Sequence, residues 1–405
     1  MSILGTIYTG LSGMLGFSKG LDVISDNVAN MNTPGFKGSN VRFEDLFYQH
    51  HVSSRTEGNL TGSQIGSGVK VADTSVSYNQ GEIRSTGNQT DAAIDGNGYF
   101  ILLDGNDRLY TRAGQFDFDA DGYLVSQTSG LRVAGINSAG QLTEISVADV
   151  RTNPPVATTE VSFQNALSEA DTTHEIDAIT IFDSSGDSHT LRMVLTDNSA
   201  VTANSWTLEV FDQDSNSIST GEIRFQTNGT PAVGFNEHQF TYTPNNGAPV
   251  DLLFSFGSPG SFSGVRTTPA GNSSMEVRNI DGYGVGAISD LTFSDDGQIT
   301  ITYSNEQSVE TDVLALAYFE NQQALRKLGS GVFVNPIEQQ VRVGKANEGV
   351  FGAIRGASLE LSNVELTQQF TDLVIIQRGF QSSSQVLTVA NEMVQELLNS
   401  SRGTG

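Results

Sequence analysis

Cysteine is absent from this chain of 405 residues, and proline occurs only nine times. Without cysteine, disulfide bonds, thiolate metal sites and cysteine nucleophiles are excluded in any compartment. Basic residues are also scarce: 21 Lys and Arg stand against 46 Asp and Glu, which gives a formal net charge of −25 at pH 7. Because nucleic acid and anionic membranes repel such a chain, we expect neither as a partner.

Long apolar runs are missing too. No stretch approaches the roughly 18 consecutive apolar residues of a membrane-spanning helix, so we expect no membrane insertion. The N-terminal stretch has its first lysine at Lys19 and lacks the basic region of a secretory signal, so we expect no cleaved signal peptide. Glycine, in contrast, is abundant, with 43 residues, and this composition is typical of short strands joined by tight turns.

The last fifty residues carry an apolar side chain at every seventh position, counted from Leu359. A period of seven held over about forty residues indicates a coiled-coil helix rather than a short globular one. Only Gly379 interrupts the stretch between Leu359 and Ser400, which has no proline. A helix with one narrow apolar stripe needs a partner, so we predict that this stripe carries self-assembly. Its expected positions are Leu359, Leu366, Leu373, Phe380, Leu387 and Val394 at the seven-residue spacing, with Ile376 and Leu397 in a second column three residues further on.

The N-terminus carries a matching pattern, in which apolar residues alternate at spacings of four and three from Ile3 to Met31. Asn32-Thr33-Pro34-Gly35 should end this helix, because the residue before proline avoids the α region. We expect the two terminal helices to pair as a coiled coil. The alternative is that each is an ordinary amphipathic helix on a globular core. The expected N-terminal positions are Ile3, Ile7, Met14, Phe17, Leu21, Ile24, Val28 and Met31.

Between the ends, period-two alternation and turn dipeptides such as Asp104-Gly105 and Asp121-Gly122 predict strands. Residues 50–67 read as an exposed, glycine-rich connector, and 313–334 fits either strands or a short helix. The predicted fold is multi-domain α+β, with discontinuous, nested all-β domains between paired terminal helices. The expected parts are the helical coiled-coil domain (1–32 and 356–405), a linker segment (33–71), a discontinuous β-domain (72–150 and 284–355) and an inserted outer β-domain (151–283).

No catalytic, metal or cofactor site stands out, and we expect the protein not to be an enzyme. The five histidines are scattered, and HExxH does not occur. Asp117, Asp119 and Asp121 match the first half of a calcium loop, but Thr128 occupies the twelfth position, where a bidentate Glu is required. We therefore interpret these aspartates as a hairpin turn.

Three segments carry a family resemblance. Residues 12–47 resemble the N-terminal signature of the bacterial flagellar axial proteins, the family of rod and hook subunits. Residues 349–399 resemble the C-terminal counterpart, and motifs within 86–125 are similar to the β-domain of the same family. Within the family, the match is best to hook proteins, through residues 318–333 and the large insert. The N-terminal motif positions are Asn27, Asn30, Asn32, Pro34, Gly35 and Phe36.

The resemblance implies a structural subunit that self-assembles through its terminal helices into a tubular, flexible coupling between rod and filament. It further implies as partners the chain itself, the distal rod, the hook cap, the hook–filament junction proteins and the flagellar type III export apparatus. The expected location is the extracellular hook. A distal rod protein and, in a different class, a secreted β-rich adhesin or hydrolase are the alternative interpretations.

Overall fold

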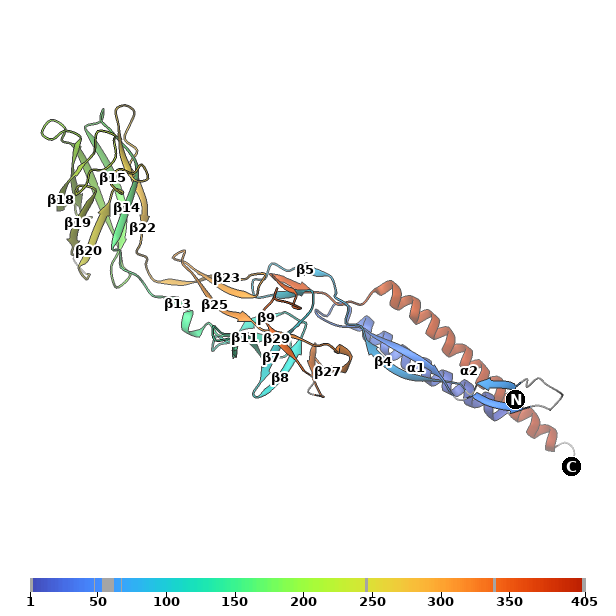
Figure 1. The fold of residues 1–405 in the computed structure, drawn as a ribbon. Coiled ribbons are helices and arrows are strands. Elements are labelled where there is room, and N and C mark those ends of the chain that lie inside the picture. The colour runs from blue at the N-terminus through green and yellow to red at the C-terminus, as the bar shows by residue number, and fades with distance from the viewer. Residues whose placement is uncertain are drawn as a thin grey trace. The chain divides into compact units, whose positions relative to one another are not determined.

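The structure is a computed structural model that describes residues 3–46, 48–52, 62–66, 68–244, 247–337 and 340–402. The chain divides into two compact units. Unit 1 comprises residues 1–148, 291–300 and 310–405, and unit 2 comprises 149–290 and 301–309. A helix lies at each end of the chain and nested β-sheets lie between them (Figure 1). This part of the predicted fold is confirmed.

The two long helices are α1 (Ile3–Ala29) and α2 (Leu366–Arg402). Helix α1 ends close to the predicted position, where Asn30 donates its side-chain amide to the Asp26 carbonyl oxygen at 3.0 Å. Gly35 follows with a φ of +69°, a left-handed conformation that only glycine adopts without strain. Neither helix, as far as the structure describes it, has the length and apolarity needed to cross a membrane.

Helix α2 begins seven residues later than the heptad count suggests. Leu359 belongs to strand β31 (Ser358–Glu360), which pairs antiparallel with β5 (Ile83–Ser85), so its placement on the helix was wrong. The physical reason is long-range. The backbone of 358–360 bonds to β5 and the Glu360 side chain is held by distant charges, so this segment is extended despite an apolar residue in heptad register.

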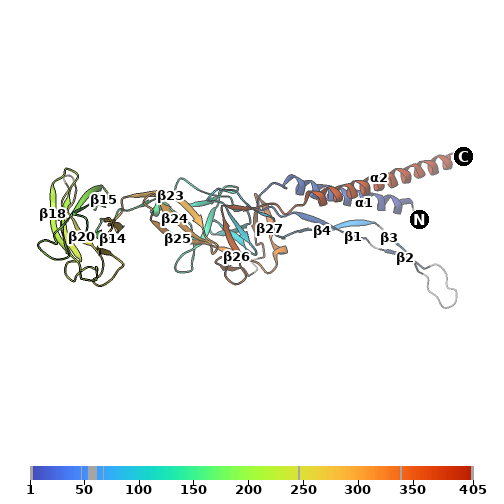
Figure 2. The same cartoon turned by 90° about the horizontal axis from the view of Figure 1, so that it is seen from above.

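Helices α1 and α2 lie side by side in both views (Figures 1 and 2). Glycines allow the close approach. A Cβ atom on Gly10 would lie 3.3 Å from the carbonyl oxygen of Ser383, and one on Gly379 would lie 2.6 Å from the Phe17 ring. Gly10 therefore marks a point where α2 packs against the bare backbone of α1.

The segment expected to be a linker forms β-ribbons instead. Strand β1 (Ser39–Asp45) pairs antiparallel with β4 (Val69–Val76), and β2 (Tyr48–Val52) pairs with β3 (Gly62–Gly66). Where the chain is described, the connector predicted over 50–67 contains the paired strands β2 and β3, and its remainder lies outside the described residues. The β1 ribbon packs on α1, with the Phe43 and Phe17 ring centroids 5.7 Å apart.

The β-rich part of unit 1 is built on a sheet in the order β25-β11-β7-β8-β28-β27. Its core contains Tyr99, Tyr110 and Phe319, and the rings of the last two meet edge-to-face at 4.7 Å. The strands of this part are β5, β6 (Ala92–Asp95), β7 (Tyr99–Asp104), β8 (Asp107–Thr111), β9 (Phe116–Phe118), β10 (Leu124–Ser126), β11 (Arg132–Ile136), β12 (Leu142–Glu144), β26 (Leu316–Tyr318), β27 (Arg326–Gly329), β28 (Val332–Val334), β29 (Arg342–Gly344), β30 (Ala353–Gly356) and β31.

Several local predictions for this part are confirmed. The acidic run forms the turn between β9 and β10, where the Asp119 side chain accepts a hydrogen bond from the Tyr123 backbone amide at 2.8 Å. Gly105 and Gly122 adopt positive φ values in their turns, as the Asp-Gly pairs predicted. The ambiguous stretch 313–334 combines short strands with one 3-10 turn, η2 (Gln322–Ala324).

Unit 2 packs two sheets around a buried core that includes Trp206, Phe163 and Phe254. One sheet runs β19-β20-β14-β21, with β22 beside β14, and the other runs β15-β16-β17-β18. An isolated bridge pairs Val156 with Tyr283, so the segments by which the chain enters and leaves the two sheets lie side by side. The strands are β14 (Glu160–Ser168), β15 (Thr173–Phe182), β16 (Ser188–Asp197), β17 (Ser205–Phe211), β18 (Ser217–Arg224), β19 (Glu237–Tyr242), β20 (Val250–Ser255), β21 (Val265–Thr268) and β22 (Glu276–Ile280).

The remaining elements lie along the chain path between the two units. They are η1 (Ala148–Val150), β13 (Thr152–Asn153), β23 (Gly286–Phe293), β24 (Gln298–Tyr303) and β25 (Ser308–Leu314). Strands β23, β24 and β25 each contribute residues to both units. The chain thus passes from one unit to the other within β23, β24 and β25, as well as after Ala148.

Gly35 offers a test of how the N-terminal segment docks in unit 1. A Cβ atom there would lie 2.5 Å from the Ala113 backbone nitrogen, whereas Gly87, with φ +74°, has nothing within 4 Å. Gly87→Ala should therefore cost only the left-handed strain of about 1–2 kcal/mol. Gly35→Ala should cost about 1–3 kcal/mol more in urea unfolding followed by circular dichroism, because overlapping atoms are added to the same strain.

Trp206 supplies an internal control for this comparison, because it is the single tryptophan and lies buried in unit 2. Its fluorescence should report the same unfolding midpoint in both variants. Equal destabilisation by the two substitutions would contradict the close docking of Gly35.

Candidate self-assembly interface

A buried carboxylate joins three distant parts of unit 1. Glu360, only 1% exposed, follows directly in the chain from Leu359. Its Oε1 accepts a hydrogen bond from Lys37 Nζ and its Oε2 accepts one from Arg112 Nε, each at 2.6 Å. The Gly81 backbone amide also donates to Oε1, at 2.9 Å. We call Lys37, Arg112 and Glu360 the junction cluster.

The two cations of the junction cluster have further partners. Lys37 Nζ also donates to the Asn79 carbonyl oxygen at 2.8 Å, and the Arg112 guanidinium donates to the carbonyls of Ile94, Gly96 and Gly98. A buried ion is tolerated only when it is paired and its remaining hydrogen-bonding capacity is largely used. The junction cluster meets this requirement only while the segments after α1, before α2 and around β8 are all in place.

The electrostatics of Glu360 follow from this arrangement. Burial alone acts to raise the pKa of its carboxyl group. The adjacent Arg112 and Lys37 charges, together with the hydrogen bond from Lys37, outweigh burial and hold the pKa below its ordinary value. Glu360 is therefore ionised at neutral pH and acts as the anionic centre of the cluster.

Sequence reasoning missed the junction cluster. Each member is the single charge in a short neutral stretch, as in the runs TPGFKGSN, LYTRAG and SLELSN. The signal that could have indicated the cluster is that each of these charges stands alone within a segment that carries the family resemblance. Their pairing could not be read from local spacing, because 323 residues separate Lys37 from Glu360.

The N-terminal motif residues have structural roles around the same junction. Asn27, 2% exposed, donates to Gln369 Oε1 at 3.0 Å and exchanges two hydrogen bonds with the Ser39 backbone. It thereby links α1 to both α2 and β1. Asn30 caps α1, the Gly35 amide donates to the Glu360 carbonyl oxygen at 2.8 Å, and the Phe36 ring lies 4.6 Å from Lys327 Nζ. Pro34 is half-buried and Asn32 is exposed.

The predicted stripe on α2 divides into two groups. Leu373, Ile376, Phe380, Leu387 and Val394 are half-buried, whereas Leu366 and Leu397 are 38% and 57% exposed. A Cβ on Gly20 would lie 2.7 Å from Ile376 Cδ1, and one on Gly10 would lie 3.5 Å from the Leu387 nitrogen. The half-buried face is thus the one that contacts α1.

The predicted stripe on α1 is only partly covered. Ile24 is buried, at 5% exposure, and Ile3 is the first helical residue. The remaining predicted positions are half-buried, namely Ile7, Met14, Phe17, Leu21, Val28 and Met31.

Both helices carry a second apolar stripe, of which only Leu397 was among the predicted positions. On α1, Leu4, Tyr8, Leu11 and Leu15 are 76%, 58%, 40% and 59% exposed, and their spacing of 4-3-4 places them on one face. On α2, Ile375, Val386, Val389, Met393 and Leu397 are 61%, 40%, 50%, 53% and 57% exposed. The same helical periodicity that revealed the first stripes could have revealed these. We call them the α1 outer stripe and the α2 outer stripe.

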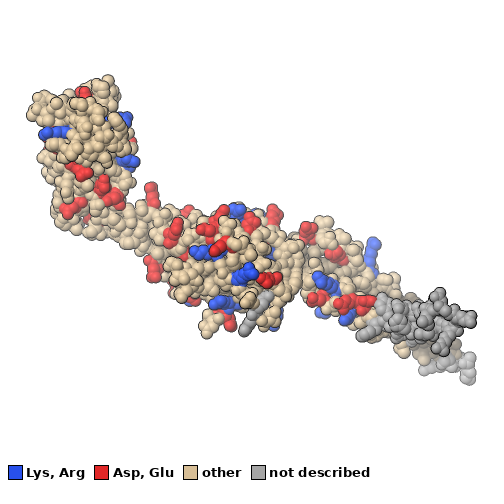
Figure 3. Space-filling model, in the orientation of Figure 1, with Lys and Arg blue, Asp and Glu red and all other residues tan. Residues whose placement is uncertain are grey.

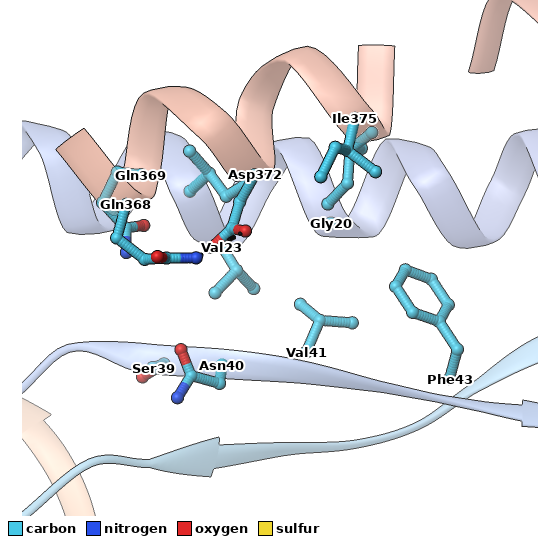
Figure 4. A pocket seen from close by; sticks show the side chains of 12 residues that line it. Gly20, Val23, Ser39, Asn40, Val41, Phe43, Gln368, Gln369, Asp372 and Ile375 are labelled. Atoms are coloured by element: carbon cyan, nitrogen blue, oxygen red, sulfur yellow. Dashed lines mark hydrogen bonds between the residues drawn. The ribbon is translucent and has the colours of Figure 1, made fainter. Parts of the chain in front are cut away.

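A groove of about 460 Å³ lies where α1, α2 and β1 meet. Figure 4 shows Val23 of α1, Val41 and Phe43 of β1, and Asp372 and Ile375 of α2 around the open space. The groove is mostly apolar with a polar rim. We call it the helix–ribbon groove, and its lining is Gly20, Val23, Ile24, Ser39, Asn40, Val41, Phe43, Gln368, Gln369, Asp372, Ile375 and Ile376.

Charge is distributed unevenly between these surfaces and the rest of the chain. On the face drawn in Figure 3, acidic side chains are scattered over the β-rich parts. Residues 1–18, by contrast, contain no charged side chain, and Lys19 is the first. An acidic chain can bring copies into close contact most easily through surfaces that carry little charge of the same sign.

The architecture combines two termini joined in one helix pair, nested β-units between them and apolar stripes exposed on both helices. Models of flagellar proteins match most of the sequence. They are described as "Flagella basal body rod protein" (residues 7–37), "Flagellar hook protein FlgE/F/G D1 domain" (93–165), "Flagellar basal body protein FlaE D2 domain" (152–371) and "Flagellar basal body rod FlgEFG protein C-terminal" (355–400).

The chain is 30% identical to the flagellar hook protein FlgE of Borreliella burgdorferi, over 98% of this chain and 99% of that protein. It is also 30% identical to the FlgE of Escherichia coli K12, over 96% and 98% of the two chains. The solved FlgE2 of Helicobacter pylori overlaps 68% of this chain and 100% of its own, with a TM-score of 0.48 and 15% identity.

The chain therefore belongs to the FlgE family of flagellar hook proteins. It is a structural subunit of the bacterial flagellar hook, and its family is structural rather than catalytic. The leading interpretation of the sequence is confirmed. The distal-rod and adhesin interpretations are not supported, because full-length relatives carry the hook name.

Glu360→Gln tests the junction cluster through pH. The pKa of Glu360 is lower in the folded protein than in the unfolded chain, where it is about 4.3. The ionised carboxylate therefore stabilises the fold fully at pH values above about 4.3. This stabilisation is lost as the pH falls through the pKa of the folded protein. At pH 7 the substitution should cost about 3–5 kcal/mol, because it leaves two buried cations uncompensated. Urea unfolding at several pH values should show the difference from wild type narrowing below about pH 4.

Glu320→Gln is the matched control. Glu320 forms an exposed ion pair with Arg342 at 2.7 Å, which should be worth at most about 1 kcal/mol at any pH. A loss at Glu360 as small as that at Glu320, or one independent of pH, would contradict the assigned role of the junction cluster.

Proposed function

We propose that this hook subunit polymerises with copies of itself through its terminal helices, and that the polymer is a tubular, flexible coupling between rod and filament. The observation that carries the proposal is the pair of outer stripes. A monomer leaves these apolar faces in water along two helices, and burying them against other copies gains free energy in proportion to the area covered.

Within one subunit, α1 and α2 pair as a coiled coil. Support comes from the seven-residue repeat and from the contacts of Gly10 and Gly20 with α2. The inner stripes hold the pair together, and the outer stripes remain for neighbouring copies. The predicted assembly positions on α2 thus fall into two sets. The half-buried residues contact α1 within a subunit, and the exposed Leu366 and Leu397 contact neighbouring subunits.

The parts of the chain take different layers in this proposal. Residues 1–32 and 356–405 form the inner tube and 33–71 connect it to the β-domain of 72–150 and 284–355. The inserted β-domain, 151–283, lies outermost. The Val156–Tyr283 bridge supports an inserted domain, because both of its chain connections meet at one place.

The remaining partners follow from a position between rod and filament. We propose contacts with the distal rod at one end of the polymer, and with the hook cap or the hook–filament junction proteins at the other. Export through the flagellar type III apparatus would deliver the subunit outside the cell. The absence of cysteine is compatible with passage as an unfolded chain.

Val389→Asp tests the role of the α2 outer stripe. Because Val389 is 50% exposed in the single chain, the substitution should change monomer stability by no more than about 0.5 kcal/mol. In the polymer it would bury an unpaired carboxylate in every subunit contact, at a cost of several kcal/mol each. Sedimentation and electron microscopy should show no polymer, while circular dichroism remains that of wild type.

Thr388→Asp is the matched control, since Thr388 is a neighbouring exposed residue of similar shape outside the stripe. This variant should polymerise normally. Normal tubes from Val389→Asp would refute the assignment of the outer stripe, and loss of polymer in both variants would show that added charge alone is responsible.

A further inference from the structure

Among the described residues of the chain, none occupies the helix–ribbon groove. Its floor is α1 from Gly20 to Ile24, its walls are β1 and the first turns of α2, and Ile375 on its edge is 61% exposed. The groove extends from Gln368 to Ile376 along α2, about 12 Å at 1.5 Å per residue. An apolar groove of this length has room for roughly two turns of a helix laid against it.

We infer that the helix–ribbon groove receives the α1 outer stripe of a second copy of this chain. This inference rests on the proposed self-assembly and names the contact that would carry it. Leu4, Tyr8 and Leu11 are spaced so that they cover about 10 Å of one helix face, which matches the length of the groove. All three are exposed in the single chain.

The stripe cannot fill the groove of its own copy. Residues 4–15 and the groove floor at 20–24 belong to one continuous helix and are centred about 19 Å apart along its axis. The contact therefore joins two different surfaces of two copies, in a head-to-tail manner. Contacts of this kind close into rings or continue as open helical assemblies, and a tubular polymer is built from such contacts.

Charge favours the α1 outer stripe over the α2 outer stripe as the occupant. The groove carries one ionisable group, Asp372, whose carboxylate accepts a hydrogen bond from Gln368 at 2.9 Å. The α2 outer stripe spans Arg378, Glu392 and Glu396, so its net charge is negative, like that of this carboxylate. The first 18 residues bring none.

Polar groups match as well. Tyr8 is the one polar member of the α1 outer stripe, and a tyrosine hydroxyl usually finds a hydrogen-bond partner when it is buried. The groove offers Asn40, Gln368 and Asp372 on its rim. An apolar stripe with one hydroxyl thus meets an apolar groove with polar edges.

Disulfide mapping tests this docking directly, because the chain has no cysteine of its own. Single-cysteine chains, Leu11→Cys and Gln368→Cys, are mixed, polymerised and oxidised, and linked peptides are identified by mass spectrometry. A disulfide requires Cβ atoms about 3.5–4.5 Å apart, so only residues in direct contact are joined. We expect a covalent dimer that links position 11 of one copy to position 368 of another.

Gln377→Cys is the matched control, a glutamine of the same helix that is exposed and outside the groove. Leu15→Cys is run in parallel with Leu11→Cys, in case one stripe variant fails to assemble. Cross-linking to position 377 as readily as to 368, or polymers in which neither stripe position links to 368, would overturn the docking and leave self-assembly standing. Absence of any polymer from the unmodified chain would overturn the proposed self-assembly itself, and the docking with it.

Discussion

The buried carboxylate of Glu360 is the constraint on which the rest of unit 1 depends. It can remain ionised inside the protein only if Lys37 and Arg112 both reach it, each at 2.6 Å. Lys37 follows α1, Glu360 precedes α2, and Arg112 follows β8, so the requirement brings both ends of the chain to one point on the β-domain. From that point the two helices leave side by side, and their glycines allow them to pack closely.

Fixing the helix pair at one end has a consequence for assembly. Once α1 and α2 cover their inner faces with each other, the orientation of their outer faces is set, and the exposed leucines, valines and isoleucine must find partners elsewhere. In a chain with a net charge of −25, copies repel one another over most of their surface. The uncharged first 18 residues and the helix–ribbon groove, which carries only Asp372, are where that repulsion is weakest. Charge and apolar exposure therefore point to the same contact.

The sequence could predict the elements better than their connections. Heptad spacing located both helices, and Asp-Gly pairs located turns such as that at Gly122, because both signals are local. Leu359 was misplaced because a periodic count cannot detect a strand partner such as Arg84 of β5, 275 residues earlier. The junction cluster was missed for the same reason. The outer stripe at Leu4, Tyr8, Leu11 and Leu15 was legible in the sequence, but exposure was needed to separate it from the inner stripe.

Electron cryo-microscopy of tubes grown from the purified chain tests the central claim most directly. We expect an inner layer of α1–α2 pairs in which the outer stripes face neighbouring subunits, with Lys37, Arg112 and Glu360 still clustered at the outer end of each pair. Tubes whose subunits contact one another only through β-units, with the outer stripes exposed to solvent, would contradict it.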